Sequence, residues 1–93
     1  MLVQRNQADN KGMFYVESDG EVHARMFYHM NAPDKMVIEH TEVDDELRGQ
    51  NVGYQLVEAS VQYARQHQIK ITVWCPFAKS VFAKKPDWRD VLD

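Results

Sequence analysis

The period of the apolar residues changes once along this chain of 93 residues, and that change constrains the fold. Residues 22–30 alternate apolar and polar side chains, which predicts a long β-strand with one buried face. From residue 53 to residue 67 the apolar positions recur at helical spacing, which predicts an amphipathic helix of about four turns. A chain with both periods is expected to pack a helix against a sheet.

Turn signals divide the first half of the chain into three predicted strands. The apolar run 13–16 is followed by Asp19-Gly20, a strong hairpin signal. Residues 31–34 have turn chemistry, and residues 35–43 after them are rich in β-branched side chains. The short links predict an antiparallel meander. Residues 1–12 are polar and are expected to be ragged at their start.

The second half of the chain predicts a parallel pair of strands. Residues 69–74 form a strand-like run after the helix, and a strand–helix–strand order favours a right-handed crossover. Pro76 ends this strand because proline has no N–H to donate, so the pair is expected to splay there. A short helix over 78–84 should end before Pro86, leaving a tail over 87–93.

These elements predict an α+β (mixed α/β) fold in a single domain spanning residues 1–93. The meander comes first, then β-α-β with a splayed parallel strand pair, then a short C-terminal helix. The tail is expected to dock through Trp88, Val91 and Leu92.

Composition argues against several classes of partner. The net charge of −3 lacks the basic footprint of a nucleic-acid-binding protein. No apolar run reaches the roughly 18 residues of a membrane span, and the N-terminus does not resemble a signal peptide. The single cysteine, Cys75, cannot form an internal disulfide, which fits a reducing cytoplasm. No spacing of Cys and His resembles a zinc site, so no metal is expected.

The connection between the third strand and the helix carries the main functional signal. Residues 46–53 read Glu-Leu-Arg-Gly-Gln-Asn-Val-Gly, with an arginine and two glycines before the helix. A tight loop can turn its backbone N–H groups inward, and the start of a helix adds unpaired N–H groups and the positive end of the dipole. This combination predicts a diphosphate site. An ordinary helix start, with Arg48 paired to Asp44 or Asp45 on the surface, is the alternative.

The order of elements and this loop together resemble the GNAT superfamily of N-acetyltransferases, whose members bind acetyl-CoA. The phosphate motif of that family is Arg/Gln-x-x-Gly-x-Gly/Ala, and residues 48–53 follow it with Asn51 in place of the first glycine. Asparagine tolerates positive φ better than most residues, so the turn is expected to survive. His-Thr-Glu-Val at 40–43 and Cys-Pro-Phe at 75–77 resemble a very small GNAT-like subfamily with a cysteine beside the acetyl group.

The resemblance, which covers residues 16–92, implies roles for the matching residues. The third strand would bind pantetheine through its backbone, the loop would hold the diphosphate, and the segment after the last strand would border the thioester. From pantetheine to the phosphates, the implied acetyl-CoA contacts are Glu42, Val43, Arg48, Gly49, Gln50, Asn51, Val52, Gly53, Pro76, Phe77, Lys79 and Lys84.

Two catalytic routes stay open at this point. In direct transfer a base, His40 or a water that it orders, takes a proton from the ammonium group and the amine attacks the thioester. In double displacement Cys75 attacks first as a thiolate, with His40 as a nearby partner, and passes the acetyl group on. Each residue also has an ordinary interpretation, Cys75 as an inert thiol and His40 as a satisfied polar residue on a strand.

The acceptor is an amine that the sequence does not identify. Larger GNAT enzymes place two helices between their first strands, where they help to bind the amine. Here the tight hairpin at 18–20 is expected in their place, so the acceptor would be a macromolecule with its own surface or would be held loosely. A CoA-binding module without catalysis and a plain protein-interaction domain are the alternatives.

Overall fold

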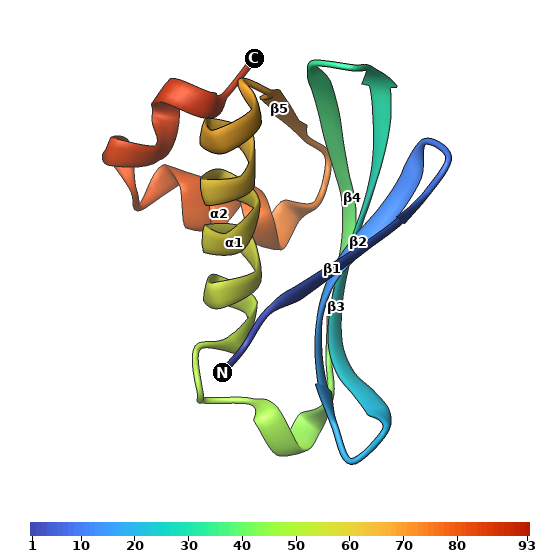
Figure 1. Cartoon of the computed structure of the whole chain (residues 1–93). Helices are drawn as coiled ribbons and strands as arrows, with labels where there is room; N and C mark the ends of the chain where they lie inside the picture. Colours follow the sequence, from blue (N-terminus) through green and yellow to red (C-terminus); the bar gives the residue numbers. More distant parts are fainter.

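The computed structural model describes all 93 residues and places two helices on one face of a five-stranded sheet (Figure 1). The strands lie side by side in chain order, from β1 to β5. The elements are β1 (Gln4–Ala8), β2 (Lys11–Ser18), β3 (Glu21–Ala32), β4 (Lys35–Val43), the 3-10 helix η1 (Asp45–Leu47), α1 (Val52–His67), β5 (Lys70–Val73), α2 (Pro76–Ala83) and the 3-10 helix η2 (Pro86–Val91). Neither α1 nor α2 combines the length and the apolar character that a membrane-spanning helix requires.

The antiparallel meander is confirmed, but it begins one strand earlier than the sequence predicts. β2, β3 and β4 pair in antiparallel order, and the β2–β3 hairpin turns through Asp19 and Gly20, both with positive φ. No strand is predicted in residues 1–12, yet β1 pairs with β2 along its whole length. β1 is a polar edge strand whose Arg5 lies over the ring of Tyr63, 4.3 Å from its centroid.

The hydrophobic core lies between the sheet and α1. The alternation in β3 buries Ala24, Met26 and Tyr28 on the face that α1 covers. From the helix, Leu56 and Val57 fill the other side of the same core. The opposite face of the sheet carries no helix (Figure 1).

β4 and β5 form the predicted parallel pair, which is short. Their register runs from Lys35 opposite Lys70 to Ile38 opposite Val73. The Ile38 carbonyl then accepts the N–H groups of Trp74 and Cys75, at 2.8 and 3.3 Å. Beyond this point β4 continues to Val43 with no strand on that side, so the pair splays.

The segments after β5 hold the C-terminus against the core. α2 begins at Pro76, two residues earlier than expected, because proline fits the first position of a helix. The tail is ordered as η2, in which Trp88 and Val91 are buried. Leu92 forms a parallel bridge with Ile71, which extends the contact of the tail with β5.

Candidate functional site

A cavity of about 540 Å³ lies where β4, the loop after it, α1 and α2 meet. Its volume falls within the range of small-molecule sites. The implied acetyl-CoA contacts that line it are Val43, Arg48, Gly49, Asn51, Val52, Gly53, Phe77 and Lys84. Lining residues that the sequence did not single out are Thr41, Leu47, Tyr54, Ser80 and Val81.

The loop offers unpaired backbone donors to this cavity. Gly49 and Asn51 both have left-handed φ angles, 83° and 59°, so Asn51 adopts a conformation that glycine adopts readily. The first intrahelical bond of α1 runs from the Gln55 N–H to the Asn51 carbonyl, at 3.0 Å. In the loop and the first turn of α1, the lining residues whose N–H groups have no acceptor in the protein are Gly49, Asn51, Val52, Gly53 and Tyr54. These donors and the positive end of the α1 dipole favour an anion at this wall.

The second glycine of the motif is needed for a close contact. A Cβ on Gly53 would lie 2.6 Å from Cζ of Phe77. The Phe77 ring therefore packs on the first turn of α1, and Phe77 as a residue is 44% exposed. Gly53 itself has no positive φ, so space and not backbone conformation explains the glycine.

Cys75 lies behind the cavity wall. It is only 4% exposed and does not line the cavity. Its Sγ lies 3.3 Å from Oγ1 of Thr41, which does line the cavity. The thiol is therefore on the same side of the sheet as the loop, one side chain away from the open space. Pro76 after it starts α2 and does not line the cavity either.

His40 lies on the other face of the sheet, so its expected proximity to Cys75 is wrong. A bulge makes Glu39 an extra residue in β4, since Tyr28 pairs with Ile38 and Phe27 with His40. The bulge reverses the alternation, and Thr41 faces Cys75 instead. His40 is exposed, stacks on Phe27 with a centroid separation of 6.2 Å, and has no path to the thiol through the packed sheet.

Glu42 shares the open face with His40. Its carboxylate bonds Nη1 of Arg25 at 2.7 Å and Nε2 of His40 at 2.9 Å. The hydrogen bond from Arg25, followed by that from His40, lowers the pKa of Glu42. The side chain of Glu42 therefore does not reach the cavity, and only the backbone of this part of β4 can serve a ligand there.

The free edge of β4 supplies that backbone. The Asp44 N–H donates to the His23 carbonyl of β3, at 2.9 Å. Because N–H and C=O groups alternate sides along a strand, those of Thr41 and Val43 point away from β3, toward the edge that β5 has left. The edge thus continues the row of polar backbone groups from the loop.

Three other residues that were expected to contact acetyl-CoA, Arg48, Gln50 and Lys79, have other partners or lie away from the cavity. Arg48 lines the cavity, but its Nε also pairs with Asp45 at 3.0 Å, the surface pair that the sequence left open. Gln50 turns back on its own loop, with Nε2 donating to the Glu46 carbonyl at 3.3 Å. Lys79 borders a separate hollow beside Arg89 on the other side of α2. Of the two expected lysines, only Lys84 lines the cavity.

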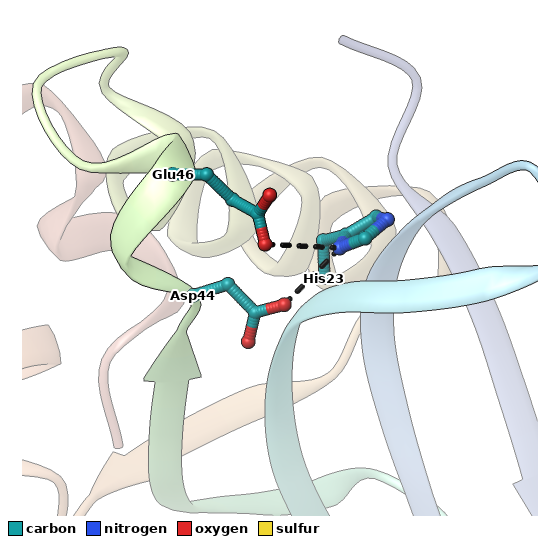
Figure 2. Close-up of side chains that lie close together, drawn as sticks. All are labelled: His23, Asp44 and Glu46. Atoms are coloured by element: carbon teal, nitrogen blue, oxygen red, sulfur yellow. Dashed lines mark hydrogen bonds and ion pairs between the residues drawn. The ribbon is translucent and has the colours of Figure 1, made fainter.

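Two acidic residues just after β4, Asp44 and Glu46, link the start of the loop to His23 of β3. Figure 2 shows the carboxylates of Asp44 and Glu46 converging on Nδ1 of His23, at 3.1 and 4.0 Å. The hydrogen bond that the His23 ring donates to Asp44 is the largest cause that raises the pKa of His23. The three ligand atoms lie within 4.8 Å of one another, close enough for a cation, although none of these residues lines the cavity. Sequence spacing did not reveal this group because only strand pairing brings His23 to Asp44.

Residues 13–91 match a family model described as GCN5-related N-acetyl-transferase. A comparison with curated proteins finds no match. A GCN5-like protein from Staphylococcus aureus, solved by NMR, is 35% identical with a TM-score of 0.73, and the match covers 97% of this chain and 87% of that one.

More distant solved structures share the fold alone. The ribosomal-protein-alanine N-acetyltransferase from Brucella melitensis biovar Abortus 2308 is 12% identical, with a TM-score of 0.68 over 84% of this chain and 62% of that one. A GNAT family acetyltransferase from Elizabethkingia anophelis, solved with acetyl-CoA bound, is 12% identical, with a TM-score of 0.62 over 83% of this chain and 53% of that one. The chain thus spans little more than half the length of these larger proteins.

Proposed function

This chain belongs to the GCN5-related N-acetyltransferase family, and we propose that it transfers the acetyl group of acetyl-CoA to a primary amine. The observation that carries the proposal is the group of unpaired N–H groups at the start of α1, all on residues that line the cavity. Val52 and Gly53 are buried and Tyr54 is half-buried, whereas Gly49 and Asn51 are exposed at the mouth of the loop. A diphosphate supplies several oxygens that can accept from these donors at once.

The cofactor would run from the loop along β4. Its diphosphate accepts from the N–H groups between Gly49 and Tyr54. Pantetheine then adds to the free edge of β4, using the backbone of Val43 and Thr41 in the manner of an extra strand. This course brings the thioester to the wall formed by Thr41, with Cys75 behind it. The support is the continuity of free backbone groups from the loop to the splay.

We propose direct transfer as the chemical route. The ammonium group of the acceptor gives a proton to solvent water, and the free amine attacks the carbonyl carbon of the thioester to form a C–N bond. The C–S bond then breaks, and the CoA thiolate that leaves takes up the second proton that the nitrogen loses. Double displacement would require Cys75 as a thiolate. The hydrogen-bond partner of its sulfur is the neutral hydroxyl of Thr41, and His40 lies on the other face, which argues against that route.

The acceptor is proposed to be large, with a surface of its own. The first two strands are joined by Asp9 and Asn10 alone, so the helices of larger relatives are missing between β1 and β2. From the sequence, the missing helices were expected at the next hairpin, residues 18–20, because β1 was not predicted. No helix between β1 and β2 is present to enclose an acceptor, so the acceptor must bring its own contacts. Figure 1 shows both helices of the chain on one face of the sheet.

Calorimetry with acetyl-CoA followed by an assay on a panel of amines tests this proposal. We expect binding and the release of free CoA thiol with at least one amine, such as a lysine-containing peptide. Binding without turnover on any amine would leave a CoA-binding module, and the absence of binding would contradict the proposal.

A further inference from the structure

His23 is the one histidine of the chain with two carboxylates beside the same ring nitrogen. Its Nδ1 lies 3.1 Å from Asp44 and 4.0 Å from Glu46, as Figure 2 shows. The other histidines that pair with an acidic residue have one carboxylate each. The three groups come from three successive places in the fold: β3, the residue after β4, and η1. Strand pairing and the start of the loop thus bring one imidazole and two carboxylates together.

This group borders an acidic hollow of about 680 Å³, separate from the cofactor cavity. His23 and Glu46 both line the hollow. The other acidic residues in its wall are Glu17, Asp19 and Glu21. No lysine or arginine lines it, and the N-terminal ammonium group of Met1 donates to Gln55 at 3.1 Å. The wall therefore carries a surplus of negative charge, which attracts a cation.

The distances within the group suit an ion of the size of Zn²⁺. Zn²⁺ binds imidazole nitrogen and carboxylate oxygen at about 2.0–2.2 Å, so two ligand atoms on one ion lie about 3.0–3.5 Å apart. The 3.1 Å between His23 and Asp44 already fits. The exposed side chain of Glu46 has to approach His23 by about 0.5–1 Å to complete the set.

The ligand types select the class of cation. An imidazole ligand favours Zn²⁺ and the neighbouring transition metals, whereas Mg²⁺ and Ca²⁺ prefer sites built from oxygen alone. The ion takes the place of the proton that His23 shares with Asp44. Three protein ligands leave at least one position on the ion for water, which the open hollow can supply.

We propose that His23, Asp44 and Glu46 bind a divalent transition-metal ion, which fastens η1 to β3. η1 has no buried residue, and the side chain of Asp44 at its start makes no capping hydrogen bond. An ion shared by Glu46 of η1 and His23 of β3 adds a link between this short helix and the sheet. The inference does not rest on the proposed function, because none of the three residues lines the cofactor cavity.

Calorimetry with ZnCl₂, on protein first freed of metal by a chelator, tests the site in the wild type, His23→Gln, Glu46→Gln and His40→Gln. His40 is the matched control, because it is an exposed histidine with a single carboxylate partner. We expect one Zn²⁺ per chain, with equal affinity in the wild type and His40→Gln. The affinity should fall at least about tenfold in His23→Gln and in Glu46→Gln. Because Glu46 is exposed, its variant still tests the site if His23→Gln folds poorly.

Two further measurements examine the class of ion and the link to stability. An excess of Mg²⁺ should leave Zn²⁺ binding unchanged. Saturating Zn²⁺ should raise the melting temperature of the wild type and of His40→Gln, and not that of Glu46→Gln, because an ion that binds only the folded state stabilises it.

Four results would overturn the assignment. They are no binding of Zn²⁺ to the wild type, an undiminished affinity in both ligand variants, an equal loss in His40→Gln, and displacement of Zn²⁺ by Mg²⁺. Each of these outcomes leaves the proposed function untouched, because acetyl-CoA binding is measured at a different cavity.

Discussion

The hydroxyl oxygen of Thr41 lies 3.3 Å from the sulfur of Cys75, across the wall of the cavity. Thr41 lines the cavity, whereas Cys75 is buried and does not line it. A buried thiol whose partner is a neutral hydroxyl is not activated as a thiolate. The position of Cys75 therefore favours a packing role over a role as nucleophile.

Replacing Cys75 with alanine should therefore leave most of the acetyl transfer intact. We expect a rate within about threefold of the wild type and a loss of unfolding free energy of about 1 kcal/mol, because a small buried group is removed. Intact-mass measurement after incubation with acetyl-CoA should find no acetyl adduct on the wild type. An adduct that forms on the wild type and is missing from Cys75→Ala would establish double displacement instead.

Two glycines with left-handed φ allow a matched test of the loop. Gly49 has φ of 83° and Gly20 has φ of 81°, and a Cβ at either position would meet no atom within 4 Å. Alanine at either position should cost about 1–2 kcal/mol of unfolding free energy, since both effects come from backbone strain. Only Gly49→Ala should also weaken CoA binding, measured by calorimetry under conditions where both variants are folded. Equal CoA affinity in the two variants would exclude the loop as the phosphate site.

Gly53 and Phe77 should be coupled in ligand binding. In Gly53→Ala the new Cβ pushes the ring of Phe77 aside, which we expect to change stability little because the ring is partly exposed, and to reduce CoA affinity about tenfold through the altered cavity. In a Phe77→Ala background the same change should raise the unfolding free energy by up to about 1 kcal/mol, because alanine is the better helix former. Thermal unfolding and calorimetry on the four proteins of this cycle measure the coupling, and strictly additive effects would show that the contact is irrelevant.

The ion pair between His23 and Asp44 predicts that the stability of the protein depends on pH. Asp44 raises the pKa of His23 above its ordinary value of 6.5, so the folded protein holds this proton more tightly than the unfolded chain. The stabilisation is fully present below pH 6.5 and is lost as the pH rises through the higher pKa of the folded state. Unfolding free energies at pH 6 and pH 8 should differ more in the wild type than in His23→Gln. The same pH dependence in both proteins would assign it to other groups.

Periodicity and turn chemistry predicted most of the fold, because local rules decide those elements. β4 has the predicted bounds of Lys35–Val43, and the Asp19-Gly20 turn closes the predicted hairpin. β1 was missed since its stability comes from pairing with β2 and from the contact of Arg5 with Tyr63, which no local pattern shows.

The site residues that belong to one continuous loop could be predicted from the sequence. The residues whose orientation depends on pairing between two strands could not. The loop from Arg48 to Gly53 needs only its own sequence to adopt its turn. The face on which His40 lies depends on the bulge at Glu39, which is set by pairing with β3. Counting by twos from Ile38 puts His40 toward α1, and the extra residue puts Thr41 there instead.

The most direct test of the central claim, that the start of α1 binds the diphosphate of CoA, is a titration of the 15N-labelled protein with CoA, followed by amide NMR. The largest shifts are expected at the N–H groups of Gly49, Asn51, Val52, Gly53 and Tyr54, since these donors have no acceptor in the protein. Shifts confined to the opposite end of the sheet, or no shifts at saturating CoA, would contradict the claim.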